Sequence, residues 1–115
     1  MRLHQAFIAC LTLVLSFVSA PTQTSANDLK KLEGDYVVAP RTGEKSEEFG
    51  LIVRGKAAEE IYAKLSVKEK PDACTGGTQK ANPGGMFCIN DGGKYMCSIG
   101  YDLSTGKVSA GPLTC

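Results

Sequence analysis

Apolar positions in the middle of the chain follow first a strand-like and then a helix-like period. In residues 49–54 (FGLIVR), Leu51 and Val53 share one face of an extended segment, which predicts a strand. From residue 57 to residue 65 the apolar side chains recur at helical spacing, which predicts an amphipathic helix of about three turns. Pro71 cannot continue a helix, so we expect the helix to end before it. The apolar stripe consists of Ala57, Ala58, Ile61, Tyr62 and Leu65.

After this helix, the chain alternates between short apolar runs and glycine-rich turns. Residues 86–90 and 95–103 predict two strands. Gly92-Gly93 between them suits a two-residue hairpin turn, because glycine accepts positive φ. Residues 108–114 predict a last strand, which its glycine and its proline weaken, so we expect it at an edge of the sheet.

The N-terminal part of the chain is more polar than the rest. In residues 27–48 we expect a loose arm with one short strand at Tyr36–Ala39, before Pro40. Residues 49–115 then form the folded domain. Their order of elements, β-α-β-β-β, predicts an α+β fold, in which a small antiparallel sheet carries one helix on one face and two disulfides staple the structure.

The beginning of the chain has the layout of a secretory signal. Arg2 precedes an uncharged run, Ala6–Val18, that is too short to cross a bilayer as a helix. We expect cleavage after Ala26, because cleavage after Ala20 would leave Pro21 directly behind the cut. An uncleaved membrane anchor is the alternative. The sequence therefore predicts a periplasmic or secreted protein with no membrane segment after cleavage, its signal being residues 1–26.

Composition excludes several classes of function. The chain has 13 Lys+Arg and 12 Asp+Glu, and loss of Arg2 with the signal leaves 12 of each sign. A net charge of zero gives no general reason to bind nucleic acid or an anionic membrane. The single histidine, His4, lies in the signal, which removes the commonest general base and metal ligand. We therefore expect no metal, no cofactor and no enzymatic activity.

Four cysteines follow the signal, and an even number in an oxidising compartment predicts two disulfides. A two-residue hairpin turn places Cys88 opposite Cys97 at a non-hydrogen-bonded pair, where Cα atoms approach to roughly 4.5 Å. This register favours a Cys88–Cys97 bridge and leaves Cys74–Cys115 as the second. The alternative pairs Cys74 with Cys88 and Cys97 with Cys115. We interpret both bridges as structural staples rather than as redox switches.

The same register divides the predicted sheet into two faces. The face of the cysteines also carries Met86, Tyr95, Ile99, Tyr101 and Leu103. This face is the more continuously apolar, so we expect it to receive the helix. The opposite face carries Phe87, Ile89, Met96 and Lys94. If that face is exposed, these residues form an apolar patch beside charge, and thus a candidate binding surface. The alternative is that the arm of residues 27–48 covers it.

Three short motifs occur between residues 49 and 103. They are Gly55-x-Ala57-Ala58-x-x-Ile61-Tyr62-x-x-Leu65, Gly84-Gly85-Met86-x-Cys88 and Tyr95-x-Cys97. This pattern resembles small exported bacterial proteins of uncharacterised function. The resemblance implies a setting in the bacterial envelope and implies no particular activity.

We therefore expect an exported small binding module of unknown ligand, such as an inhibitor or an accessory protein of the bacterial envelope. Its partner would be another envelope protein. One alternative is a structural envelope protein without a ligand. The other is a small enzyme without histidine, for which Glu59 and Glu60 are the candidate carboxylates; adjacent helix positions point in different directions, which makes a solvated helix face the favoured interpretation.

Overall fold

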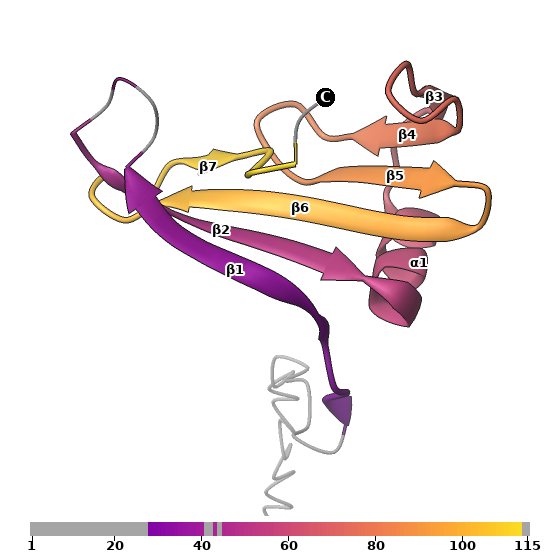
Figure 1. Ribbon diagram of the computed structural model, residues 1–115, viewed down its shortest axis with the longest axis horizontal. Helices are drawn as coiled ribbons and strands as arrows, with labels where there is room; N and C mark the ends of the chain where they lie inside the picture. The colour runs from indigo at the N-terminus through magenta and orange to yellow at the C-terminus, as the bar shows by residue number, and fades with distance from the viewer. Residues whose placement is uncertain (1–27, 41–42, 44, 114–115) are drawn as a thin grey trace, which may run out of the picture.

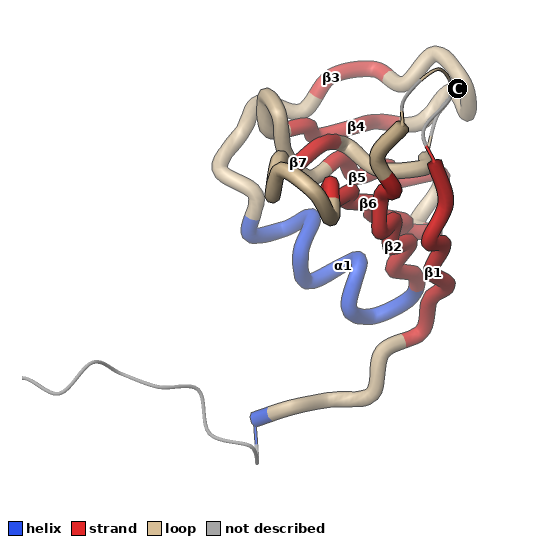
Figure 2. Tube along the Cα trace, turned by 90° about the vertical axis from the view of Figure 1, so that its left-hand side faces the viewer, coloured by secondary structure: helices blue, strands red, loops and turns tan. Residues whose placement is uncertain are grey.

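One antiparallel sheet with a helix on one face makes up the described part of the chain (Figures 1 and 2). The structure is a computed structural model, and it describes residues 28–40, 43 and 45–113. Its elements are β1 (Glu33–Pro40), β2 (Glu47–Arg54), α1 (Gly55–Lys64), β3 (Lys70–Pro71), β4 (Thr78–Ala81), β5 (Phe87–Asp91), β6 (Lys94–Asp102) and β7 (Val108–Ser109). The strands lie in the order β1-β2-β6-β5-β4-β3, and β7 pairs with β6.

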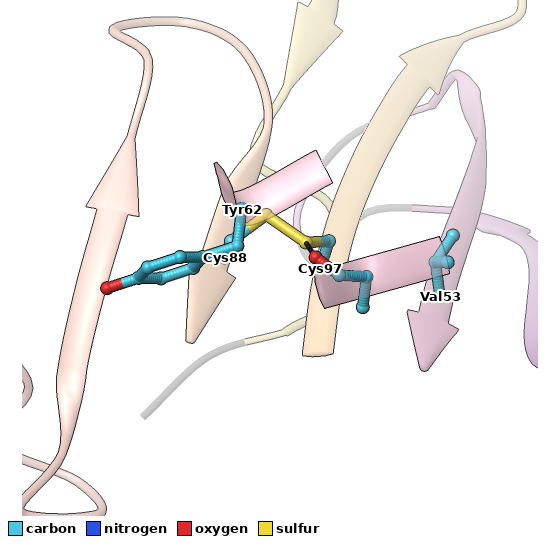
Figure 3. Packing of buried hydrophobic residues seen from close by; sticks show 5 residues of the cluster. Val53, Tyr62, Cys88 and Cys97 are labelled. Atoms are coloured by element: carbon cyan, nitrogen blue, oxygen red, sulfur yellow. Dashed lines mark hydrogen bonds between the residues drawn. A yellow bond between two sulfur atoms is a disulfide. The ribbon is translucent and has the colours of Figure 1, made fainter. Parts of the chain in front are cut away.

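The core lies between α1 and the face of the sheet that carries the hairpin cysteines (Figure 3). Val53 of β2 packs there with Ala58 and Tyr62 of the helix, and all three are buried. Cys88 and Cys97 complete the cluster and are fully buried. The prediction that the cysteine face receives the helix is therefore confirmed.

Three residues expected on this core face, Ile99, Tyr101 and Leu103, are not part of the core. Tyr101 is 46% exposed and Leu103 is 51% exposed. The helix lies near the end of β6 that begins at Lys94, as Figure 1 shows. Tyr101 lies at the opposite end of that strand, and Leu103 directly follows it. A helix of ten residues cannot cover the whole length of the sheet.

The hairpin of β5 and β6 has the predicted register. Asp91 pairs with Lys94 across the turn, and Cys88 pairs with Cys97. A disulfide joins these two cysteines, whose Cα atoms lie 4.0 Å apart. The Cys88–Cys97 bridge is confirmed, and it excludes the alternative pairing of these cysteines. The predicted partner of Cys74 is Cys115, which lies outside the described residues, so the second bridge stays a prediction.

The order of elements differs from the predicted β-α-β-β-β. The short strand expected at Tyr36–Ala39 is an eight-residue strand, β1, which pairs with β2 along its whole length. β3 and β4 were not predicted, and β4 pairs with β5 on the other side of the hairpin. The last strand covers only Val108–Ser109 instead of residues 108–114. The sequence of β4, TQKA, is polar, and only its partners in the sheet make it a strand.

Tyr62 connects the helix to β4. Its hydroxyl lies 2.7 Å from Oγ1 of Thr78. The Nζ of Lys80 donates to the carbonyl oxygens of Tyr62 and Leu65 at the end of the helix, at 2.9 Å and 3.4 Å. The same Nζ lies 4.8 Å from the centroid of the Tyr62 ring. Burial raises the pKa of the Tyr62 phenol. Thr78 and Lys80 of β4 thus supply hydrogen-bond partners to the C-terminal part of α1.

The predicted secretory signal, residues 1–26, lies outside the described residues. The predicted cleavage after Ala26 lies there as well, so export stays a prediction. Within the described part of the chain, no helix is both long enough and apolar enough to span a membrane.

Candidate functional site

The residues predicted as a binding surface lie on β5 and β6, on the sheet face opposite α1. Ile89 is only 9% exposed, and Phe87 and Met96 are half-buried. Lys94, next to the hairpin turn, is exposed. Ile89, Lys94 and Met96 line one pocket, and Phe87 does not line it. The structure therefore brings three of the four predicted residues together.

The segment after β7 lies over this face, an arrangement that neither sequence interpretation anticipated. The hydroxyl of Ser98 in β6 donates a hydrogen bond to the carbonyl of Ala110. A Cβ atom at Gly50 of β2 would lie 2.9 Å from Cδ of Pro112, which shows that this proline packs directly on the strand. β1 occupies an edge of the same sheet by pairing with β2, and does not lie over the face.

Glycine at position 111 permits this close approach. Its φ is +81°, and a Cβ atom there would lie 2.6 Å from the carbonyl carbon of Ile99. Any other residue would combine an unfavourable backbone conformation with a clash against β6. Gly111 therefore lets the C-terminal segment lie against the backbone of β6 and carry Leu113 onward to the pocket.

The pocket at the tip of the hairpin has a volume of about 280 Å³. Its apolar lining includes Ile89, Met96 and Leu113. Asp91 and Lys94, which pair across the hairpin turn and are both exposed, add one charge of each sign. The arrangement is a small apolar cavity beside solvated charges.

Cys74 lines the same pocket as Leu113. Leu113 precedes Cys115 by two residues in the sequence. Two extended residues span at most about 7 Å, so the chain reaches the neighbourhood of Cys74 shortly before Cys115. Cys115 itself lies outside the described residues, so the Cys74–Cys115 bridge stays a prediction.

A second pocket, of about 480 Å³, lies at the start of α1 and is lined mainly by charged residues. Two of its basic side chains have acidic partners, since Arg54 pairs with Asp35 and Lys56 pairs with Glu59 at 3.7 Å. Glu60, the other carboxylate named from the sequence, pairs with Lys30 at 3.3 Å. Glu59 and Glu60 thus each contact a lysine on the surface, and the structure does not bring them together in a pocket.

Asp102 is a buried carboxylate at the end of β6, only 7% exposed. The hydroxyl of Ser46 donates to Oδ2 at 2.7 Å, and the N–H groups of Ser104 and Thr105 donate to Oδ1 at 2.8 Å and 2.9 Å. The bond from Ser46 is the largest cause, and with the backbone donors it lowers the Asp102 pKa from 3.8 to about 2. Asp102 therefore holds the turn after β6 and ties it to the residue before β2.

We expect this carboxylate to make the protein sensitive to acid. A pKa that is lower in the folded state contributes stability above pH 3.8, and that contribution is lost as the pH falls towards about 2. Urea unfolding at a series of pH values should show this loss, and Asp102→Asn should remove that part of the pH dependence. If Asp102→Asn loses stability with falling pH as the wild type does, the acid sensitivity comes from other groups.

In the part of the chain that the structure describes, no group of three or more His, Cys, Asp or Glu side chains could hold a metal ion.

The chain matches no protein-family model, no curated protein and no solved structure in the comparisons made. The site must therefore be interpreted from its own geometry.

Sequence reasoning missed the contribution of the C-terminal segment to the site. Leu113 lines the pocket, and Gly111 and Pro112 place the segment against the sheet. The pair Gly111-Pro112 was the available signal, because it interrupts the strand predicted for residues 108–114. A glycine-proline pair after a short strand can redirect the chain over the sheet as readily as it can weaken an edge strand.

Proposed function

We propose that this chain is an exported protein-binding module of the bacterial envelope, and that the pocket at the hairpin tip receives an apolar side chain of a protein partner. The observation that carries the proposal is the convergence of Ile89, Met96 and Leu113 on one pocket beside the exposed Lys94. Well-packed apolar pockets of this kind, with charge nearby, are where protein interfaces concentrate their binding energy.

The size of the pocket favours a protein side chain over a small molecule. Small-molecule and cofactor sites usually enclose about 300–1,000 Å³ and bury most of the ligand. The pocket here, at about 280 Å³, lies just below that range. An aliphatic or aromatic side chain from a partner fits such a volume, while the surrounding surface supplies the rest of an interface.

The buried disulfide supports the proposed location. Cys88 and Cys97 are oxidised at the centre of the core. Structural disulfides persist in oxidising compartments such as the bacterial periplasm and are rare in the cytosol. Together with the predicted signal at residues 1–26, this favours an exported protein whose partner is another envelope protein.

A capture experiment with matched variants tests the binding proposal. Tagged protein, expressed in an exporting bacterium from the full-length chain, is used to isolate partners from the envelope fraction. We expect a partner that the wild type retains and that Met96→Asp and Lys94→Glu lose, because the first places a charge in the pocket and the second reverses the charge beside it.

Lys107→Glu is the control, because it makes the same change of charge on an exposed residue that does not line this pocket. It should retain the partner, and all variants should keep the circular dichroism spectrum of the wild type. Equal capture of the partner by wild type, Met96→Asp and Lys94→Glu would exclude the pocket as the binding site.

A further inference from the structure

β1 forms one end of the sheet and leaves an edge open (Figure 1). Among the described strands it pairs with β2 alone. Tyr36 is 74% exposed and Val38 is 49% exposed, although both are good strand formers. An open edge presents unpaired N–H and C=O groups that can pair with another chain. Natural edges are often protected by a lysine, a proline or a bulge; β1 carries no lysine between Glu33 and Pro40, and its proline stands at the last position of the strand.

The pairing pattern shows which backbone groups face this open edge. The N–H of Leu103 donates to the carbonyl of Glu47 at 3.0 Å, so the backbone groups of Glu47 face β6. Because these directions alternate along a strand, those of Gly50 face β1 and meet its partner there, Val37. The backbone groups of Gly34, Tyr36 and Val38 must then point away from β2, towards the open edge.

We propose that two copies of this chain pair antiparallel through β1, with Tyr36 opposite Tyr36 on a two-fold axis. In this register Gly34 of each copy lies opposite Val38 of the other, so all the outward-facing backbone groups of these residues find partners. The result is one continuous sheet across both copies.

Neighbouring registers are less favourable. A two-fold axis through Asp35 would place the two aspartates directly opposite each other, and like charges in that position are destabilising. An axis through Val37 would place Pro40 opposite Gly34, and proline has no N–H to complete the ladder. The register through Tyr36 places Asp35 opposite Val37, and it places Pro40 opposite Leu32, which precedes the strand.

The side chains of the edge are self-complementary in this register. Tyr36 and Val38 lie on the same face of β1, since side chains alternate along a strand. The Tyr36 ring already contacts Phe49 of β2, with 6.3 Å between ring centroids. In the pair, each Tyr36 would gain the other Tyr36 directly opposite and Val38 on the diagonal, which are the cross-strand contacts that stabilise sheets.

Symmetry favours a second copy over an unrelated partner. Tyr36 meets Tyr36 on the axis, and the pair of Gly34 with Val38 forms twice, once on each side of it. Both halves of the complementarity reside in one chain, which is what a symmetric interface requires.

Analytical ultracentrifugation of the purified exported protein tests the proposal. We expect the mass of the wild type to approach that of two copies as the concentration rises, and Tyr36→Lys to remain a single copy because two lysines would face each other on the axis. Tyr36→Phe and Ala81→Lys are controls that should still dimerise, the second being an exposed substitution on β4, which β2, β6 and β5 separate from β1. A monomeric wild type, or a Tyr36→Lys variant that dimerises as the wild type does, would overturn the proposal.

Disulfide trapping tests the register independently of that variant. Residues opposite each other at a hydrogen-bonded pair have Cα atoms about 5.5 Å apart, within disulfide range. Tyr36→Cys should therefore form a covalent dimer under mild oxidation. In Val37→Cys the two new cysteines would be offset by two residues, at roughly 8 Å, so the covalent dimer should be far less abundant. Trapping of Val37→Cys in preference to Tyr36→Cys would exclude this register.

Discussion

Removal of the Cys88–Cys97 disulfide is expected to lower the free energy of unfolding by about 3 kcal/mol through the cross-link alone. The bridge closes a short loop, with a sequence separation of nine, and the loss reflects the freedom that the unfolded chain regains. Both cysteines are fully buried beside Ala58 and Val53, so replacing them with alanine also removes packed sulfur from the core. Cys88→Ala/Cys97→Ala should therefore lower the free energy of unfolding by more than the cross-link alone contributes.

Two double variants separate these contributions. Cys88→Val/Cys97→Val keeps apolar volume at a cross-strand pair but has no cross-link, so it should lie between the wild type and the alanine variant. Urea unfolding of the three proteins measures the differences. If the valine variant is as stable as the wild type, packing rather than the covalent bond is what the cysteines contribute.

The hairpin was predictable because its register follows from a few neighbouring residues. Two glycines define the turn, and counting outward from them places Cys88 opposite Cys97. The helix was predictable for the same reason, since its apolar residues recur within a few turns of one another. In both elements, the residues that determine the structure are close in the sequence.

β1 and β4 depend on partners that are distant in the sequence, and this is why their extents were missed. Nearly all of β1 is exposed, so it lacks the alternation of buried and exposed positions that identifies a strand. β4 is polar, and its Thr78 and Lys80 form their hydrogen bonds with Tyr62 only because the end of α1 lies beside them. Such pairings follow from the whole fold rather than from a local pattern.

The candidate site was predictable in part, for a related reason. The alternation of side chains along the hairpin placed Ile89 and Met96 on one face, and in the structure both line the same pocket. The third apolar wall, Leu113, reaches the pocket only because Gly111 allows the C-terminal segment to lie against β6. A glycine's conformation is visible in the structure, but the sequence alone does not show which way it turns the chain.

Tyr62→Ala is expected to lower the free energy of unfolding by about 3–5 kcal/mol, the range for truncating a large aromatic side chain in a core. The ring is 5% exposed and contacts Tyr95 edge-on, with 5.4 Å between ring centroids. Its loss would also remove the contact with Lys80, whose Nζ lies over the ring, and leave the Thr78 hydroxyl without this partner. The helix would then be joined less firmly to β4.

Two further variants distinguish the ring from its hydroxyl. Tyr62→Phe keeps the ring and loses only the hydrogen bond to Thr78, so we expect a loss of about 0.5–1.5 kcal/mol. Tyr101→Ala removes a tyrosine that is 46% exposed, and its effect should be well below that of Tyr62→Ala. Urea unfolding of all three gives the order. If Tyr62→Phe is as destabilised as Tyr62→Ala, the hydroxyl contact with β4 rather than ring burial is what holds α1 on the sheet.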